Sequence, residues 1–238
     1  NATHVYLAIG VYTVSVMVLD DDGGSHSATF TITVNATASA KFTVVDQSDK
    51  KFYQYSSDYG FIRSLPLNAN NTVAQGVTSN PVGNRFWVVD NDKRIYVYDQ
   101  DGLFLGRWSA TGINNPEDIT TDGTHLWIIA KASNNQGGSE KYHLYYFQGG
   151  ASWMGATGNS QDESPSPTAA YSLDSDNRDP VGLTFGKRSV NGAMKSQLWV
   201  TDNRGSVSGN GNKVPRVFMY DLSGHKDGEW TLDTRNTT

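Results

Sequence analysis

The chain has 238 residues, a formal net charge of −5 and no cysteine. Disulfides, Cys-ligated zinc and thiol chemistry are therefore excluded. We expect no nucleic-acid surface, because phosphate backbones are bound by clustered Lys and Arg, whereas the 19 basic residues here are scattered along an acidic chain. No stretch approaches the ~20 consecutive apolar residues that a membrane span needs.

The first expected element is a β-hairpin. Most residues of Val11–Leu19 are β-branched or aromatic, and alternate residues such as Val14 and Val16 fall on one face of a strand. Asp20–Gly24 reads Asp-Asp-Asp-Gly-Gly, a turn signal, and Ser27–Val34 alternates again as the return strand. Because an isolated hairpin is marginal in water, we expect this to be the least stable part of the chain.

A longer pattern runs through the same N-terminal stretch, H-x-Y…G-x-Y-x-V-x-L-x-V-x-D-x-x-G. The matching positions are His4, Tyr6, Gly10, Tyr12, Val14, Val16, Val18, Asp20 and Gly24. The stretch resembles the C-terminal part of a PKD domain, which implies half of an Ig-like β-sandwich over residues 1–34, followed by a linker at 35–40. Since the family's earlier half is missing and the chain does not open on Met, we expect a fragment of a longer parent chain.

From Lys41 onward the chain repeats itself, and the repeats predict an all-β fold. A first buried strand ending in a polar turn is expected at Phe42–Asp46, Phe86–Asp90, Leu126–Ala130 and Leu198–Asp202. A second strand is expected at Lys51–Tyr55, Arg94–Tyr98, His143–Phe147 and Arg216–Tyr220. A third is expected at Phe61–Leu65, Phe104–Trp108, Trp153–Thr157 and ending at Trp230. A fourth is expected at Ala74–Thr78, Pro116–Thr120 and Pro180–Thr184.

Four short strands in ~40–45 residues are typical of a β-propeller blade. We expect blades near 41–85, 86–125, 126–197 and 198–238, the third expanded and the last incomplete. The pattern W-V-x-D…I-Y-V-Y-D-x-x-G…P-x-x-I-T-x-D-G…L-W over Trp87–Trp127 resembles the NHL-like repeats of six-bladed propellers. About four blades are too few for a ring of six, so the parent chain is again expected to continue.

Acidic residues recur at the ends of the expected strands. Asp46, Asp90 and Asp202 end the first strand in three copies. They could form a ring of carboxylates around a central channel, but the favoured interpretation is that each caps the turn that follows it. Two Asp pairs look like fragments of calcium loops but lack the full Asp-x-Asp-x-Asp-Gly with a distal Glu. We expect no cofactor, and the residues to examine for Ca²⁺ are Asp90, Asp92, Asp99 and Asp101.

Repeated tryptophans allow two interpretations. Exposed rings could stack on sugars, whereas equivalent strand positions favour packing between blades. The positions are Trp87, Trp127 and Trp199 in one register, and Trp108 and Trp230 in another. The loop Gly158–Asp179 is either a specificity feature or a disordered insertion. The resulting candidate binding residues are Trp108, Trp153, Asp174 and Asp176.

These patterns favour a non-catalytic module over an enzyme, because the five histidines are far apart and no nucleophile elbow or His-Glu-x-x-His is present. We expect a binding, adhesion or scaffold module of a large bacterial secreted or cell-surface protein. Its spacer would be PKD-like, and its propeller would present a face to a protein or glycan ligand. An accessory part of an extracellular lyase or glycan-active enzyme is the alternative, and a purely structural stalk is a third.

Overall fold

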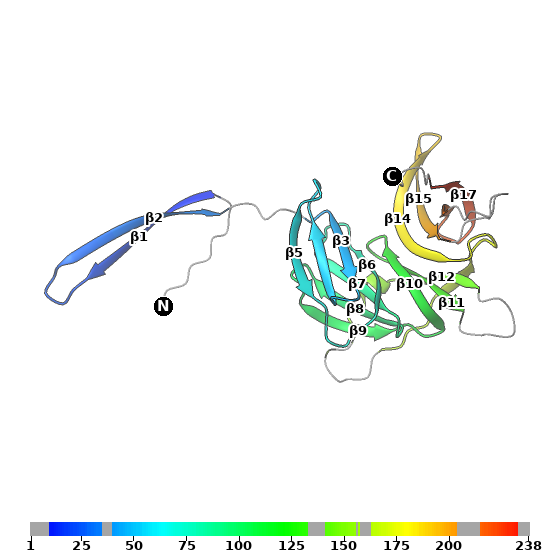
Figure 1. Ribbon diagram of the computed structural model, residues 1–238, viewed down its shortest axis with the longest axis horizontal. Coiled ribbons are helices and arrows are strands. Elements are labelled where there is room, and N and C mark those ends of the chain that lie inside the picture. The colour runs from blue at the N-terminus through cyan, green and yellow to red at the C-terminus, as the bar shows by residue number, and fades with distance from the viewer. Residues whose placement is uncertain are drawn as a thin grey trace. The chain divides into compact units, whose positions relative to one another are not determined.

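A computed structural model describes residues 10–34, 40–132, 141–155, 157, 163–203 and 215–232 (Figure 1). The chain divides into two compact units, Asn1–Ser39 and Ala40–Thr238. It is an all-β protein, as predicted. Within the described residues the one helical element is a 3-10 turn, η1 (Gly150–Ser152).

The first unit is the predicted hairpin of β1 (Gly10–Leu19) and β2 (Ser25–Val34). The strands are antiparallel, and Val14 lies opposite Phe30. A two-stranded sheet has only one layer, so its apolar face stays in water: Val16 is 48% and Phe30 50% exposed. The described residues of this unit, 10–34, therefore form no buried core.

The second unit contains four antiparallel sheets in chain order, which we call blades 1 to 4. Blade 1 contains β3 (Phe42–Asp46), β4 (Lys51–Tyr55) and β5 (Phe61–Pro66). Blade 2 contains β6 (Ala74–Ser79), β7 (Arg85–Asp90), β8 (Arg94–Asp99) and β9 (Phe104–Ser109). Blade 3 contains β10 (Ile113–Thr121), β11 (Leu126–Ala132), β12 (Tyr142–Phe147) and β13 (Ala169–Ser172). Blade 4 contains β14 (Pro180–Val190), β15 (Ala193–Asp202), β16 (Arg216–Tyr220) and β17 (Lys226–Thr231).

The blade limits expected from the sequence repeat differ from the sheets. The strand at Ala74–Ser79, expected to close the first blade, pairs instead with β7 of the next one, with Val77 opposite Val88. The strands β10 and β14 join the following blade in the same way. The last strand of each sequence repeat thus belongs to the next sheet. There it is the first strand, and it pairs with the strand that follows it in the chain. Blade 1 consequently has three strands.

The outer strand of blade 3 also differs from expectation. The strand expected at Trp153–Thr157 lies instead at Ala169–Ser172, and Trp153 directly follows η1. The Trp153 ring packs edge-on against Trp108 of blade 2, with centroids 5.2 Å apart. Farther along, the Ser109 N–H donates to the Glu163 carbonyl at 2.8 Å. The expanded part of blade 3 therefore folds back onto the outer strand of blade 2.

Three apolar cores join the blades, one at each boundary between consecutive sheets. Along every strand, alternate side chains face the preceding blade and the others face the following one. We call these two faces of a blade its N-flank and its C-flank. In blade 2 the N-flank consists of Phe86, Val88, Tyr96 and Tyr98, and the C-flank consists of Trp87, Val89, Ile95, Val97 and Trp108.

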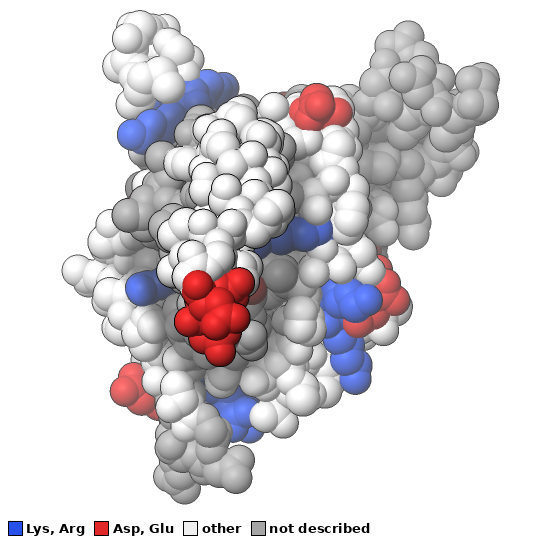
Figure 2. Space-filling model, turned by 90° about the vertical axis from the view of Figure 1, so that its left-hand side faces the viewer, with Lys and Arg blue, Asp and Glu red and all other residues white. Residues whose placement is uncertain are grey.

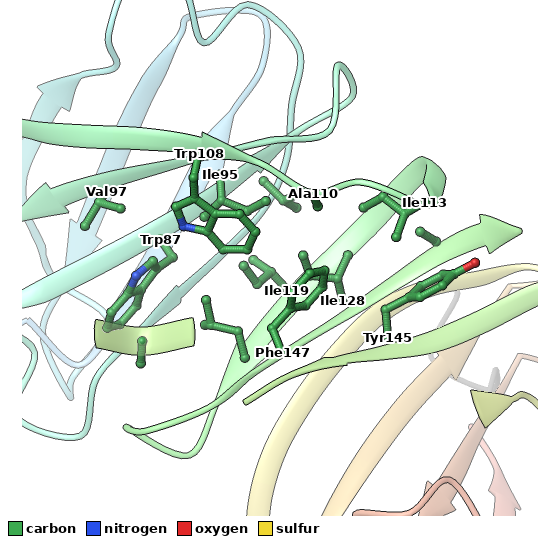
Figure 3. Close-up of a cluster of buried hydrophobic side chains, with 14 residues drawn as sticks. Trp87, Ile95, Val97, Trp108, Ala110, Ile113, Ile119, Ile128, Tyr145 and Phe147 are labelled. Atoms are coloured by element: carbon green, nitrogen blue, oxygen red, sulfur yellow. The ribbon is translucent and has the colours of Figure 1, made fainter. Parts of the chain in front are cut away.

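The core between blades 2 and 3 shows this packing most clearly (Figure 3). Trp87 and Trp108 meet Ile128 and Phe147, and the rings of Trp108 and Phe147 are 5.3 Å apart. Trp127 fills the next core in the same manner. Packing is therefore the role of these buried tryptophans, and they are not free to stack on a ligand.

Candidate functional site

The first strands of blades 2, 3 and 4 lie next to one another and bring a carboxylate between two glycines. At one repeated position these strands carry Gly76, Asp118 and Gly182. A Cβ on Gly76 would collide with the Asp118 carboxylate. Asp118 Oδ2 accepts the Leu183 N–H of blade 4 at 2.7 Å, and Oδ1 accepts the Ile119 N–H at 2.8 Å. A glycine in blade 2 thus makes room for an acid that ties blade 3 to blade 4.

Burial raises the pKa of the Asp118 carboxyl group to about 7, against the two backbone N–H donors, which lower it. Next to it, Thr120 Oγ1 accepts the Phe185 N–H at 2.9 Å. The junction of blades 3 and 4 therefore depends on side-chain acceptors on β10, one of which titrates near neutral pH.

Beside Asp118, the side chain of Glu117 forms a second polar group with Tyr142 and Lys131. Tyr142 Oη donates to Glu117 Oε1 at 3.1 Å, and Lys131 Nζ lies 5.5 Å from the centre of the Tyr142 ring. Burial raises the pKa of Glu117, while the Tyr142 hydrogen bond and the Lys131 charge lower it. The three side chains lie near the end of β11 that corresponds to Asp90 in blade 2. We call this end of the blades the loop face.

We predict that Tyr142→Phe raises the pKa of Glu117 further. The substitution removes the hydroxyl that donates to the ionised carboxylate, so the charged form loses about 1 kcal/mol of stabilisation. This corresponds to a rise in the pKa of somewhat less than one unit. A carboxyl-carbon NMR titration of Glu117 measures the shift directly. An unchanged or lowered pKa in Tyr142→Phe would show that the hydroxyl does not stabilise the carboxylate.

Two loops of the loop face are attached to the blades in the same way. In the loop before blade 2, the Asn68 N–H and Asn71 Nδ2 donate to the Tyr98 hydroxyl at 3.0 and 3.2 Å. The Val73 N–H of this loop donates to Asp90 Oδ2 at 2.9 Å.

The loop before blade 4 repeats these bonds with different residues. The Asp174 N–H and Asn177 Nδ2 both donate to the Tyr220 hydroxyl at 3.1 Å, and the Asp179 N–H donates to Asp202 Oδ2 at 2.9 Å. A Tyr and an Asp of the sheet thus hold each loop at both ends. We call this arrangement the Tyr–Asp clamp.

We predict that Tyr98→Phe destabilises the second unit by about 1–3 kcal/mol and loosens the loop 68–73. The change leaves two donors without the acceptor that they share, and Asn71 is fully buried. Hydrogen exchange of residues 68–73 should quicken more than that of β7, and chemical denaturation gives the loss in stability. Equal quickening of both segments would mean that the hydroxyl supports the blade as a whole and not this loop.

Turn capping is the observed role of two of the repeated strand-end aspartates, Asp46 and Asp90. Asp90 is 1% exposed, and its Oδ1 accepts the Asp92 N–H at 3.1 Å in addition to the clamp bond. Asp46 Oδ1 likewise accepts the N–H groups of Ser48 and Asp49. These bonds account for the repetition of Asp at this place.

The candidate calcium ligands form two pairs at opposite ends of β8, each with protein partners. Asp92 is paired with Arg94, and Asp101 with Arg63 at 3.0 Å. Asp99 Oδ1 accepts two backbone N–H groups of its turn. Over the described residues, no three His, Cys, Asp or Glu side chains are grouped so that they could hold a metal ion. Calcium binding at Asp90 or the other three stays a prediction.

Among the four candidate binding residues, the prediction for Trp108 is wrong, and the surroundings of the other three are as follows. Trp108 is fully buried between blades, so its ring has no face for a ligand. Trp153 is half-buried against it. Asp174 pairs with Lys226 at 3.3 Å, and Asp176 lies 3.7 Å from Arg178 in the loop before blade 4. Of the loop Gly158–Asp179, residues 158–162 lie outside the described residues.

The sequence interpretation missed Glu117 and Asp118, although both lie inside the expected strand Pro116–Thr120. The available signal was the alignment of the fourth strands, where the position of Asp118 holds glycine in the two other copies. An acid flanked by equivalent glycines predicts a side chain that occupies space its neighbours leave empty.

The second unit is a β-propeller arrangement of four blades. Its antiparallel sheets follow one another along the chain, the first strands of blades 2 to 4 lie side by side, and an apolar core fills each boundary between blades. No family model and no curated protein matches the chain. Among solved structures, it is similar to the β-propeller domain of Cps50 (Swd1) from Myceliophteria thermophila, with 8% identity and a TM-score of 0.38. That similarity covers 82% of this chain and 56% of the other, so the chain spans little more than half of that structure. Among the described residues, no helix is long and apolar enough to cross a membrane.

Proposed function

We propose that the chain is a non-catalytic binding module of a large secreted or cell-surface protein, with the loop face of its propeller unit as the ligand platform. The observation that supports this most is the repeated Tyr–Asp clamp. Loops usually carry binding residues because a rigid scaffold positions them, and here the same bonds position two loops on one face. The hairpin would be part of a PKD-like spacer, and the blades would be NHL-like repeats of a bacterial protein.

The proposed ligand is a protein or a glycan that contacts the loops 68–73 and 174–179 and the polar group of Glu117, Lys131 and Tyr142. Carboxylates, an ammonium group and a phenol on one face suit hydroxyl-rich or peptide-like partners, which offer both donors and acceptors. A nucleic acid is not the expected partner. In the space-filling view, the visible Lys and Arg side chains lie in several separate places and form no continuous basic surface (Figure 2).

The test is a screen of the purified chain on glycan and peptide arrays, followed by variants of the loop face. Lys131→Ala and Glu117→Gln are expected to weaken a genuine ligand about 10-fold or more. Leu103→Ser is the matched control, because Leu103 is exposed in the turn at the opposite end of β8. Binding that is lost in Leu103→Ser and kept in the loop-face variants would contradict the proposal.

A glycan-active enzyme is the second candidate, and one observation favours it. Glu117 combines a raised pKa with a hydrogen-bonded phenol, which is a pairing suited to proton transfer. Incubating any bound glycan with the chain and analysing it by mass spectrometry separates the two functions. Cleavage that is abolished in Glu117→Gln would establish the enzyme, while an intact glycan supports the binding module.

A further inference from the structure

An aromatic cluster lies at the boundary of blades 3 and 4, at the end of the blades opposite the loop face. We call this end, which includes the turns 80–84 and 122–125, the turn face. Two rings pack against Trp127: the Tyr146 ring at 5.2 Å between centroids and, from blade 4, the Phe185 ring at 6.1 Å. His125 lies edge-on to Tyr146 at 5.3 Å. Trp127 is buried, whereas the other three side chains are half-buried. The boundary therefore ends in partly exposed rings that a buried tryptophan supports.

Three polar atoms of this cluster can donate hydrogen bonds that the protein does not use. His125 Nδ1 accepts the Gly149 N–H at 3.0 Å, so the ring proton is on Nε2. Tyr171 of β13 packs against the same core as Tyr146. In the part of the chain that the structure describes, neither the His125 Nε2–H nor the hydroxyls of Tyr146 and Tyr171 have a hydrogen-bond partner. None of the three atoms is buried without a partner, so a ligand in solution can reach them.

The charge around Tyr146 keeps its hydroxyl a donor. Burial raises the pKa of Tyr146, and the Asp122 carboxylate and Tyr171 raise it further, so the hydroxyl holds its proton at neutral pH. The Asp122 carboxylate serves its own turn, where Oδ1 accepts the N–H groups of Thr124 and His125 at 2.8 and 2.7 Å. The cluster therefore offers donors beside a carboxylate that already has protein partners.

Blade 4 extends beyond the other blades at this boundary. In blades 2 and 3 the first two strands turn after the pairs Ser79–Phe86 and Thr121–Leu126. The equivalent pair of blade 4 is Phe185–Leu198, and five further pairs follow it before the turn. The resulting hairpin of β14 and β15 projects past the neighbouring strands (Figure 1). It therefore brings additional side chains to the turn face, next to the aromatic cluster.

One of these additional side chains is a lysine without an acidic partner. Lys187 comes two residues after Phe185, so both lie on the same face of β14. It is exposed, and no carboxylate pairs with it among the residues that the structure describes. Lys195 of the same hairpin differs, because it is paired with Asp227. The hairpin thus holds an unpaired ammonium group on the side of the aromatic cluster.

We propose that the turn face at the boundary of blades 3 and 4 binds an acidic sugar, a hexuronate unit of a glycan. The rings of Tyr146 and Phe185 would contact the apolar C–H surface of the sugar, and the free donors its hydroxyl oxygens. The Lys187 ammonium would pair with the carboxylate in a charge-assisted hydrogen bond. Four groups that can all donate suit a ligand rich in acceptors. Since this site lies at the other end of the blades from Glu117, it is independent of the loop-face platform.

The first experiment titrates the 238-residue chain with tetrasaccharides of galacturonic and of mannuronic acid, followed by calorimetry and by NMR. At least one of them is expected to bind with a Kd below about 1 mM. The matched ligand is the same tetrasaccharide with its carboxylates reduced to alcohols, which is expected to bind about 10-fold more weakly because it cannot pair with Lys187. Failure of both acidic tetrasaccharides to bind, or equal affinity for the reduced forms, would overturn the proposal.

The second experiment places the ligand with variants. Lys187→Ala is expected to weaken the acidic tetrasaccharide about 10-fold and to leave the reduced one unchanged. Lys195→Ala, which removes the same charge from the same hairpin, is the control and should bind as the wild type does. Tyr146→Phe keeps the ring and its packing but removes one donor, so a loss of about 5-fold is expected without a change in fold.

The loop face supplies the variant that separates this proposal from the function proposed above. Glu117→Gln should leave binding of the acidic tetrasaccharide unchanged. Binding that is lost in Glu117→Gln and kept in Lys187→Ala would place the sugar on the loop face and overturn the turn-face site. Equal affinities of Lys187→Ala and Lys195→Ala for the acidic tetrasaccharide would overturn it as well.

Discussion

Trp108→Ala is expected to lower the free energy of unfolding of the second unit by about 3–5 kcal/mol, the usual cost of removing a large buried aromatic side chain. Trp108 is completely buried, and its ring meets Phe147 across the boundary between blades 2 and 3 and Trp153 from the expanded part of blade 3. Denaturation followed by tryptophan fluorescence measures the loss in this unit alone, because every tryptophan of the chain lies after Ala40.

Trp230→Ala is the matched control for this prediction. It removes the same side chain at the same register position of blade 4, where 44% of the residue is exposed. The expected loss is about 1 kcal/mol, because much of this side chain already lies in water. Similar losses in both variants would contradict the view that burial between blades, rather than the blade itself, stabilises the unit.

Asp118→Asn is expected to remove a fall in stability between about pH 4 and pH 7. Burial raises the pKa of Asp118 to about 7 in the folded chain, above its ordinary value of 3.8. Between these values the folded state holds a proton that the unfolded state has released, so stability decreases as pH rises through this range. The effect is on the order of 2–4 kcal/mol. Urea denaturation across this pH range, with and without the substitution, measures it.

Asp227→Asn provides a control of opposite sign. The hydrogen bond from Lys195 lowers the pKa of Asp227, so its contribution to stability is present above its ordinary value of 3.8 and is lost as pH falls. Relative to the wild type, Asp227→Asn should therefore lose more stability at neutral pH than at acid pH, which is the reverse of the trend for Asp118→Asn. If Asp118→Asn leaves the slope between pH 4 and 7 unchanged, the raised pKa is wrong.

The sequence predicted the strands well wherever the residues themselves carry the signal. The segment Phe86-Trp-Val-Val-Asp90 alternates large apolar side chains between two covered faces, and it forms all but the first residue of β7. The expanded blade shows the limit of this approach. The repeat predicts a third strand at Trp153–Thr157, after a Gly-bearing turn, whereas the strand consists of Ala169–Ser172, a short segment of small residues and one Tyr. Its place is decided by pairing with β12 and not by its own propensity.

The site was harder to predict than the fold, because its residues act through partners far along the chain. The clamp joins Asn71 to Tyr98 and Asn177 to Tyr220, and no local pattern reveals such bonds. Glu117 meets Tyr142 from another strand for the same reason. By contrast, the capping role of Asp46 and Asp90 was the favoured interpretation, since an aspartate at the end of a strand bonds N–H groups only a few residues away.

The central claim is that cores between consecutive blades hold the second unit together, and native-state hydrogen exchange tests it most directly. Amides of β7 and β11, which lie between two cores, are expected to exchange only through global unfolding. Amides of the hairpin β1–β2 should exchange within seconds, because no second layer covers it among the residues that the structure describes. If β7 and β11 exchange as fast as the hairpin, the blades do not share cores and the propeller arrangement is contradicted.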